Sequence, residues 1–216
     1  LNVIMVKNRS VTNEWRVYHS SANGGTNPEQ WSLRMDTDNA QADSYYWIDT
    51  APTNQVFSLN DNQVVNSGHG NQYMALAFHD VTGYSKFSAY TGNGSDQTIT
   101  LGFKPSMVVI KKASATGNWI VVDTMRDFNI GKRKDLNLDR NATETTRDPE
   151  ICTFTETGFS VKGNGIVGGS GTYIYMAWAD TREFAYWLDQ SGNNNDWETH
   201  SLTESDVSLD TPSQNF

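Results

Sequence analysis

Cysteine and positive charge are both scarce in this chain of 216 residues. The lone Cys152 excludes a disulfide framework within the chain, and its neighbours Ile151 and Phe154 predict a buried thiol in a strand. The 16 basic and 25 acidic side chains give a formal net charge of −9, which argues against binding to nucleic acid. No apolar run approaches the roughly 20 residues of a membrane-spanning helix, so we expect no membrane insertion.

Asparagine and glycine, by contrast, are abundant, with 21 and 17 residues, and 12% of the chain is aromatic. Asparagine and glycine suit tight turns because they tolerate positive φ. Between the Asn/Gly clusters lie short runs rich in Val, Ile, Tyr, Trp and Thr, and none shows a sustained helical period. This pattern predicts an all-β, antiparallel fold.

The chain contains an internal repeat. Val3–Lys7 recurs as Met107–Lys111, and a tryptophan follows each lysine after eight residues, at Trp15 and Trp119. Further on, 73–80 recurs as 173–180, and shorter matches lie between these blocks in the same order. We therefore predict two tandem, internally duplicated β-sandwich modules of jelly-roll type, over 1–83 and 84–184, with a C-terminal extension at 185–216.

Strands are expected in the second module near 98–101, 107–112, 118–124, 135–139, 151–155, 158–162 and 172–179. The last of these carries apolar groups on both faces, which indicates a central strand. The first module lacks the lead-in that precedes the second, so we expect an unpaired edge at Leu1–Lys7. Such an edge favours a homo-oligomer with a subunit contact near Leu1–Lys7 or Thr199–Phe216.

Several motifs together resemble a known family. They are Gly102-Phe103-Lys104-Pro105, then 169–179, then Trp187–Asn193, and finally Asp210-Thr211-Pro212. This order is similar to the duplicated β-rich module of virion structural proteins, including tail fibres, of tailed bacteriophages, especially marine ones. In that family the module leads into a laminin-G-like or concanavalin-like segment. The resemblance implies an extracellular virion appendage and association with other virion proteins.

No catalytic constellation is evident in the sequence. The four histidines stand in no zinc-binding motif, and His19 and His79 have no histidine counterpart in the other repeat, so we expect exposed or strand-end histidines. Acids recur in both repeats, Asp36 with Asp139 and 80 with 180, and a duplicated acid at a strand end usually orders a turn. We therefore predict that the chain is not an enzyme.

Two kinds of binding site remain as hypotheses. Oxygen ligands cluster in the loop from 189 to 196, where Ca²⁺ could be held by Asp189, Asn193, Asn195 and Asp196, although the loop departs from the EF-hand pattern. Three tryptophans without a counterpart in the other repeat are candidates for stacking on a sugar: Trp31, Trp47 and Trp197.

These observations favour a non-catalytic structural and adhesive component of a phage virion, one that contacts host-surface glycans. Two alternatives stay open. One is a carbohydrate-binding surface module of a secreted bacterial protein, and the other is a glycan-degrading tailspike, which would need two carboxylates facing each other across a groove.

Overall fold

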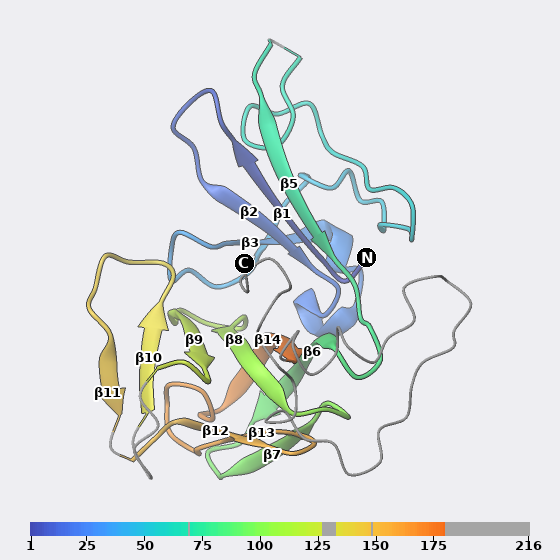
Figure 1. The fold of residues 1–216 in the computed structure, drawn as a ribbon. Coiled ribbons are helices and arrows are strands. Elements are labelled where there is room, and N and C mark those ends of the chain that lie inside the picture. Colours follow the sequence, from blue (N-terminus) through green and yellow to red (C-terminus); the bar gives the residue numbers. More distant parts are fainter. Residues whose placement is uncertain (69, 127–132, 148, 180–216) are drawn as a thin grey trace, which may run out of the picture.

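The computed structural model describes residues 1–68, 70–126, 133–147 and 149–179, and Figure 1 shows their arrangement. Apart from two 3-10 turns, η1 (Ala22–Gly25) and η2 (Pro28–Gln30), the regular elements of these residues are all strands. The all-β, antiparallel fold predicted from the sequence is therefore confirmed. Short, β-branched and aromatic runs separated by Asn/Gly turns form strands because their side chains pack well on a pleated surface.

The first repeat forms a five-stranded sheet in the order β4-β3-β2-β1-β5. Its strands are β1 (Val3–Asn8), β2 (Trp15–His19), β3 (Trp31–Arg34), β4 (Ala42–Asp43) and β5 (Tyr73–Phe78). β1 lies in the interior of the sheet and pairs antiparallel with β2 on one side and β5 on the other. The expectation that Leu1–Lys7 is an unpaired edge is therefore wrong, because β5 returns from far along the chain to cover it.

The second repeat forms two sheets. The larger has the order β11-β10-β9-β8-β14-β6 and the smaller the order β12-β13-β7. As predicted, the last strand β14 is central, between β8 and β6. The strands of the second repeat are β6 (Ser85–Gly92), β7 (Gln97–Thr100), β8 (Pro105–Lys112), β9 (Trp119–Asp123), β10 (Arg133–Asn137), β11 (Thr145–Arg147), β12 (Cys152–Thr155), β13 (Gly158–Val161) and β14 (Gly171–Ala179). The predicted ranges agree with seven of these strands to within about two residues, whereas β6 and β11 were not predicted.

The two repeats pair their strands in the same order and in the same register. β1 meets β2 at Val3↔His19, and β8 meets β9 at the equivalent positions Met107↔Asp123. Likewise β1 meets β5 as β8 meets β14, and β3 and β10 take equivalent registers on β2 and β9. The sequence repeat is thus matched by a repeat of backbone pairing.

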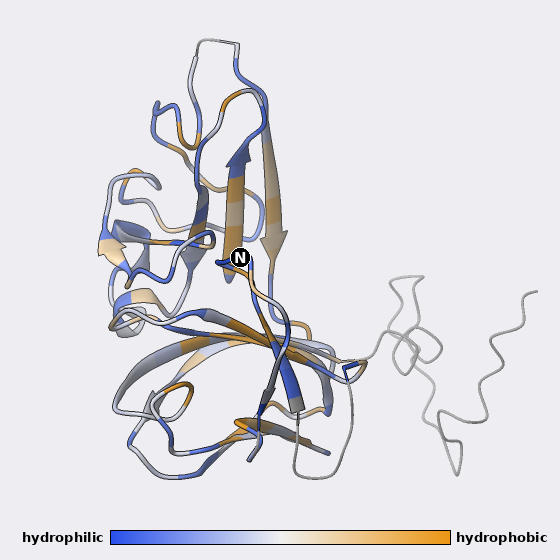
Figure 2. Ribbon diagram, turned by 90° about the vertical axis from the view of Figure 1, so that its left-hand side faces the viewer, coloured by the Kyte–Doolittle hydropathy of each residue, from blue (hydrophilic) through white to orange (hydrophobic). Residues whose placement is uncertain are grey.

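The sheets stack in three layers, with the first repeat above the six-stranded sheet and the three-stranded sheet below it (Figure 1). One core cluster fills the space between the two sheets of the second repeat, with Phe159 and Tyr175 among its members. A second cluster joins the two repeats, because it combines Met5 and Leu33 with residues of the six-stranded sheet such as Ile174. Hydrophobic residues follow the strands, and hydrophilic ones follow the loops (Figure 2). The tandem repeats therefore share one core.

Hydrogen bonds reinforce this contact between the repeats. Trp119 of the second repeat donates its indole N–H to the carbonyl of Arg34 at 2.8 Å. The ammonium of Lys111, which is fully buried, donates to the carbonyl of Asp38 at 3.2 Å. Burial lowers the pKa of Lys111 to about 8, against a smaller raising effect of the carboxylates of Asp139 and Asp38. The contact is thus both apolar and specifically hydrogen-bonded.

His19 lies in the same contact and is fully buried; of the two expected positions, exposed or strand-end, it takes the strand end. It stands at the end of β2, where its Nδ1 accepts a hydrogen bond from the backbone N–H of Ser21 at 3.1 Å. Its Nε2 is 3.2 Å from the carbonyl oxygen of Tyr175 in β14 and donates to it. Burial lowers the pKa of His19 to about 4, so the ring is neutral at pH 7.

Candidate functional site

A groove of about 370 Å³ opens on the first repeat, on the face of its sheet that points away from the second repeat. The floor comes from β2 and β4, and the walls come from the segments that follow β4 and precede β5. We call it the Tyr45 groove, and its polar and aromatic lining is made of Arg16, Asp43, Ser44, Tyr45, Tyr46, Asn60 and Asn62.

Arg16 is the charged residue of the floor, and its position follows from strand alternation. Its neighbour Val17 points into the core shared by the repeats, so Arg16 points to the opposite face. Its guanidinium forms an ion pair with Glu14, donates to the Ser32 hydroxyl at 3.3 Å, and lies 4.3 Å from the centre of the Tyr46 ring. These contacts hold the Arg16 side chain in one place.

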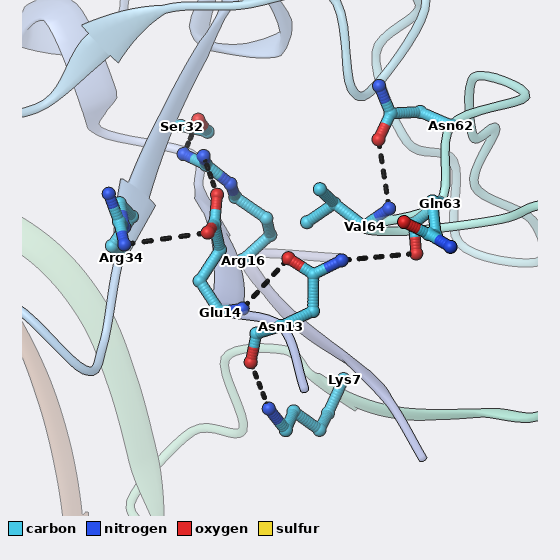
Figure 3. Close-up of polar contacts among 9 residues, drawn as sticks. All are labelled: Lys7, Asn13, Glu14, Arg16, Ser32, Arg34, Asn62, Gln63 and Val64. Atoms are coloured by element: carbon cyan, nitrogen blue, oxygen red, sulfur yellow. Dashed lines mark hydrogen bonds and ion pairs between the residues drawn. The ribbon is translucent and has the colours of Figure 1, made fainter. Parts of the chain in front are cut away.

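Glu14 is shared between two arginines, as Figure 3 shows. Besides Arg16, its carboxylate contacts the guanidinium of Arg34 at 3.4 Å. The two guanidinium groups and the carboxylate of Glu14 thus form one ion-pair group beside the groove. The Nε of Arg16 is buried and has no hydrogen-bond partner among the described residues.

The walls of the groove are fixed by backbone hydrogen bonds. Asn60 donates its N–H to the carbonyl of Tyr46 at 2.9 Å, and the Asn62 side chain accepts from the N–H of Val64 at 2.9 Å (Figure 3). Ser44 donates its N–H to the carbonyl of Gln30 at 2.8 Å. Its hydroxyl is buried and has no partner among the described residues. Tyr45 is 57% exposed, so a ligand can reach its ring.

Trp47 supports the groove from below and is not a surface group. It is 1% exposed, packs edge-on against Tyr18 with ring centres 5.8 Å apart, and donates its indole N–H to the carbonyl of Trp31 at 3.0 Å. The prediction of a sugar-stacking face at Trp47 is therefore wrong, because the ring is in the core of the first repeat. Its role is to anchor the segment that carries Tyr45.

Trp31 is half-buried and belongs to β3, but it is not part of the groove lining. Strand alternation puts it on the same face as Leu33, toward the second repeat. Sequence reasoning missed Tyr45, although the run Asp43–Trp47 of aromatic and polar residues, without a counterpart in the other repeat, was a usable signal.

The remaining predicted site residues lie outside the described residues: Trp197, and the proposed Ca²⁺ ligands Asp189, Asn193, Asn195 and Asp196. Among the residues that are described, no three His, Cys, Asp or Glu side chains lie close enough together to hold a metal ion. Of the recurring acids, Asp80 bridges the turn before β6, whereas Asp139 links the end of β10 to the start of β9. Asp139 accepts from the N–H of Trp119 at 2.9 Å, and Asp80 accepts from the N–H of Phe87 at 2.8 Å.

A known family covers both repeats of the chain. A family model described as a domain of unknown function, DUF7483, matches residues 1–182. The chain belongs to the DUF7483 family. The DUF7483 match spans both repeats, their shared core and the Tyr45 groove. Neither a curated protein nor a solved structure matches the chain. Across the described part of this DUF7483 protein, no helix is long and apolar enough to cross a bilayer.

Proposed function

We propose that this chain is a non-catalytic structural and adhesive component of a bacteriophage virion, in a tail fibre or another appendage. It contacts glycans of the host surface through the Tyr45 groove. Its partners are other virion proteins and further copies of itself. The virion assignment is supported by the resemblance of the sequence motifs to phage structural modules, and the glycan contact is supported by the groove.

The chemistry of the groove is the observation that carries the adhesive function. An accessible tyrosine ring offers a flat face for the C–H groups of a sugar, while the hydroxyls of the sugar need polar partners. Here Tyr45 supplies the ring, and Arg16, Asp43 and Ser44 supply donors and acceptors beside it.

Binding of the full chain to immobilised bacterial surface polysaccharides tests the adhesive function. Tyr45→Ala should weaken binding about tenfold or more, equivalent to about 1.4 kcal/mol, because it removes the stacking face. Val56→Ala is the matched control, since Val56 is 62% exposed and lies outside the groove. If Tyr45→Ala binds as tightly as the wild type, the groove is not the binding site. If the wild-type chain binds none of the polysaccharides, the adhesive role is contradicted.

The virion assignment is tested separately, by electron microscopy of phage particles labelled with an antibody against this chain. Label on a tail appendage is the expected result. Label on a bacterial surface, with none on particles, would instead favour a carbohydrate-binding module of a secreted bacterial protein.

A glycan-degrading tailspike is the remaining alternative, and Asp43 is where it can be examined, because Asp43 is the carboxylate of the groove lining. If Asp43 only binds hydroxyls, incubation with polysaccharide releases no new reducing ends. Release of reducing ends by the wild-type chain, and its loss in Asp43→Asn, would favour the tailspike.

A further inference from the structure

The charged groups of the Tyr45 groove bear on which class of sugar it can bind. Among the described residues that line the groove, one side chain is cationic, Arg16, and one is a carboxylate, Asp43. The other lining side chains are uncharged, with amide, hydroxyl, methyl or phenol groups. Sugar units of a glycan are either neutral or acidic, and an acidic unit needs a cationic partner in its site. The surroundings of Arg16 and Asp43 therefore decide between the two classes.

The guanidinium of Arg16 is already occupied on each of its nitrogens. Its Nη2 pairs with the carboxylate of Glu14, its Nη1 donates to the Ser32 hydroxyl at 3.3 Å, and its Nε is buried (Figure 3). One face of the group lies 4.3 Å from the centre of the Tyr46 ring, and 11% of the side chain is exposed. A single further N–H can serve a sugar hydroxyl, but the two-pronged edge that holds a carboxylate is taken.

Glu14 is difficult to displace from this arrangement. Its side chain is 19% exposed and contacts both Arg16 and Arg34. A ligand carboxylate that replaced it on Arg16 would leave Glu14 with its second arginine contact, the one to Arg34 at 3.4 Å. Removal of one partner from a largely buried ion pair is costly, because the remaining charge loses compensation. Arg16 is therefore a paired group and does not attract an anionic ligand.

Asp43 repels an anionic ligand. It belongs to β4, the strand at one end of the order in the first sheet, and both residues of β4 are exposed. A carboxylate in the lining raises the energy of any ligand carboxylate beside it. The net charge of −9 acts in the same direction at longer range. For a sugar hydroxyl, by contrast, the Asp43 carboxylate is a hydrogen-bond acceptor.

Asn62 complements Asp43 as a donor. Its side-chain oxygen accepts a hydrogen bond from the N–H of Val64 at 2.9 Å, so its NH2 group is the part of the amide available to donate (Figure 3). A hydroxyl both donates and accepts, and a lining that combines an acceptor with a donor suits it on both counts. The ring of Tyr45, 57% exposed, offers the apolar face that a sugar ring covers.

We propose that the Tyr45 groove selects neutral, hydroxyl-bearing sugar units and excludes acidic units such as uronic acids, with Asp43 as the residue that excludes them. The inference rests on the proposed glycan contact and adds the class of sugar to it. The groove volume of about 370 Å³ is at the lower end of the range for small-molecule sites, so a short stretch of the glycan enters it.

A matched pair of ligands tests this selectivity in the full chain. The starting ligand is the polysaccharide that the wild type binds and Tyr45→Ala does not. If it is neutral, its primary hydroxyls are oxidised to carboxylates; if it is acidic, its carboxyl groups are reduced to primary alcohols, and the linkages stay the same. The neutral member should bind about threefold or more tightly at low salt, the effect of one nearby like charge in water. Added salt should narrow the difference, because it screens exposed charges. Equal or tighter binding of the acidic member would overturn the proposal.

Two variants that remove one negative charge locate the effect. Asp43→Asn should bring the ratio of the two affinities close to one. Glu156→Gln is the control, because its side chain is 83% exposed and lies between β12 and β13, outside the groove, and it should keep the wild-type ratio. The same ratio in Asp43→Asn as in the wild type, or an equal loss in both variants, would contradict the role of Asp43. If no polysaccharide shows binding that depends on Tyr45, the proposed glycan contact itself fails, a result distinct from a failure of selectivity.

Discussion

Protonation of His19 should weaken the contact between the repeats, because burial disfavours the charged form of the ring. The side chain is fully buried, with Nε2 donating to the Tyr175 carbonyl and Nδ1 accepting from the N–H of Ser21. A second proton would have to sit on Nδ1 and would displace that accepted hydrogen bond. The folded state therefore resists protonation, and the pKa of His19 falls from 6.5 to about 4.

The size and sign of the effect follow from this shift. Between pH 6.5 and about 4 the unfolded chain binds a proton at His19 that the folded chain does not bind, so stability falls as the pH falls. Above pH 6.5 the contribution is fully present. At about 1.4 kcal/mol for each pH unit, the loss of unfolding free energy amounts to about 3 kcal/mol by pH 4.

Urea unfolding of the wild type and of His19→Gln, followed by tryptophan fluorescence from pH 7.5 to pH 4, measures this loss. His19→Gln keeps a neutral donor but has no proton to gain, so it removes the background from titrating carboxylates. The difference in unfolding free energy between the two proteins should shrink by about 3 kcal/mol as the pH falls from 6.5 to 4. A difference that stays constant with pH would show that His19 is not the group that titrates.

Two further predictions concern packing. Leu33→Ala should cost about 3 kcal/mol of unfolding free energy in urea titrations, because the side chain is fully buried in the shared core; the exposed Val56→Ala should cost less than about 0.5 kcal/mol. Gly158→Ala should lower the melting temperature, since a Cβ there would lie 2.0 Å from the Ile99 carbonyl oxygen, whereas Gly165→Ala meets nothing within 4 Å and should melt like the wild type. Equal melting of the two glycine variants would contradict the close strand approach.

Strand positions could be predicted from the sequence because the repeat and the turn residues mark them. The matched blocks at Val3–Lys7 and Met107–Lys111 both form strands at equivalent registers. The two apolar faces of β14 correctly indicated a central strand. The sequence of β14 does not indicate which sheet packs against each of its two faces. Tyr175 faces the three-stranded sheet, while Ile174 faces the other repeat. Which sheet covers a face depends on tertiary packing.

The groove was less predictable, since its walls are irregular backbone. The segment after Tyr45 turns through Ile48 and Asp49, both in the left-handed region with φ of 46° and 47°. A β-branched residue rarely adopts this conformation, so no turn pattern predicts it. The same backbone path buries Trp47 and exposes Tyr45, although Trp47, without a counterpart in the other repeat, was the residue predicted to be accessible.

Calorimetric unfolding shows whether the two repeats are one structural unit. The shared cluster and the hydrogen bond from Trp119 to Arg34 link the repeats, so neither should unfold alone. We expect one transition over residues 1–179, with a calorimetric enthalpy equal to the van't Hoff enthalpy. Two resolved transitions, or a calorimetric enthalpy about twice the van't Hoff value, would mean that the repeats unfold independently and do not share one core.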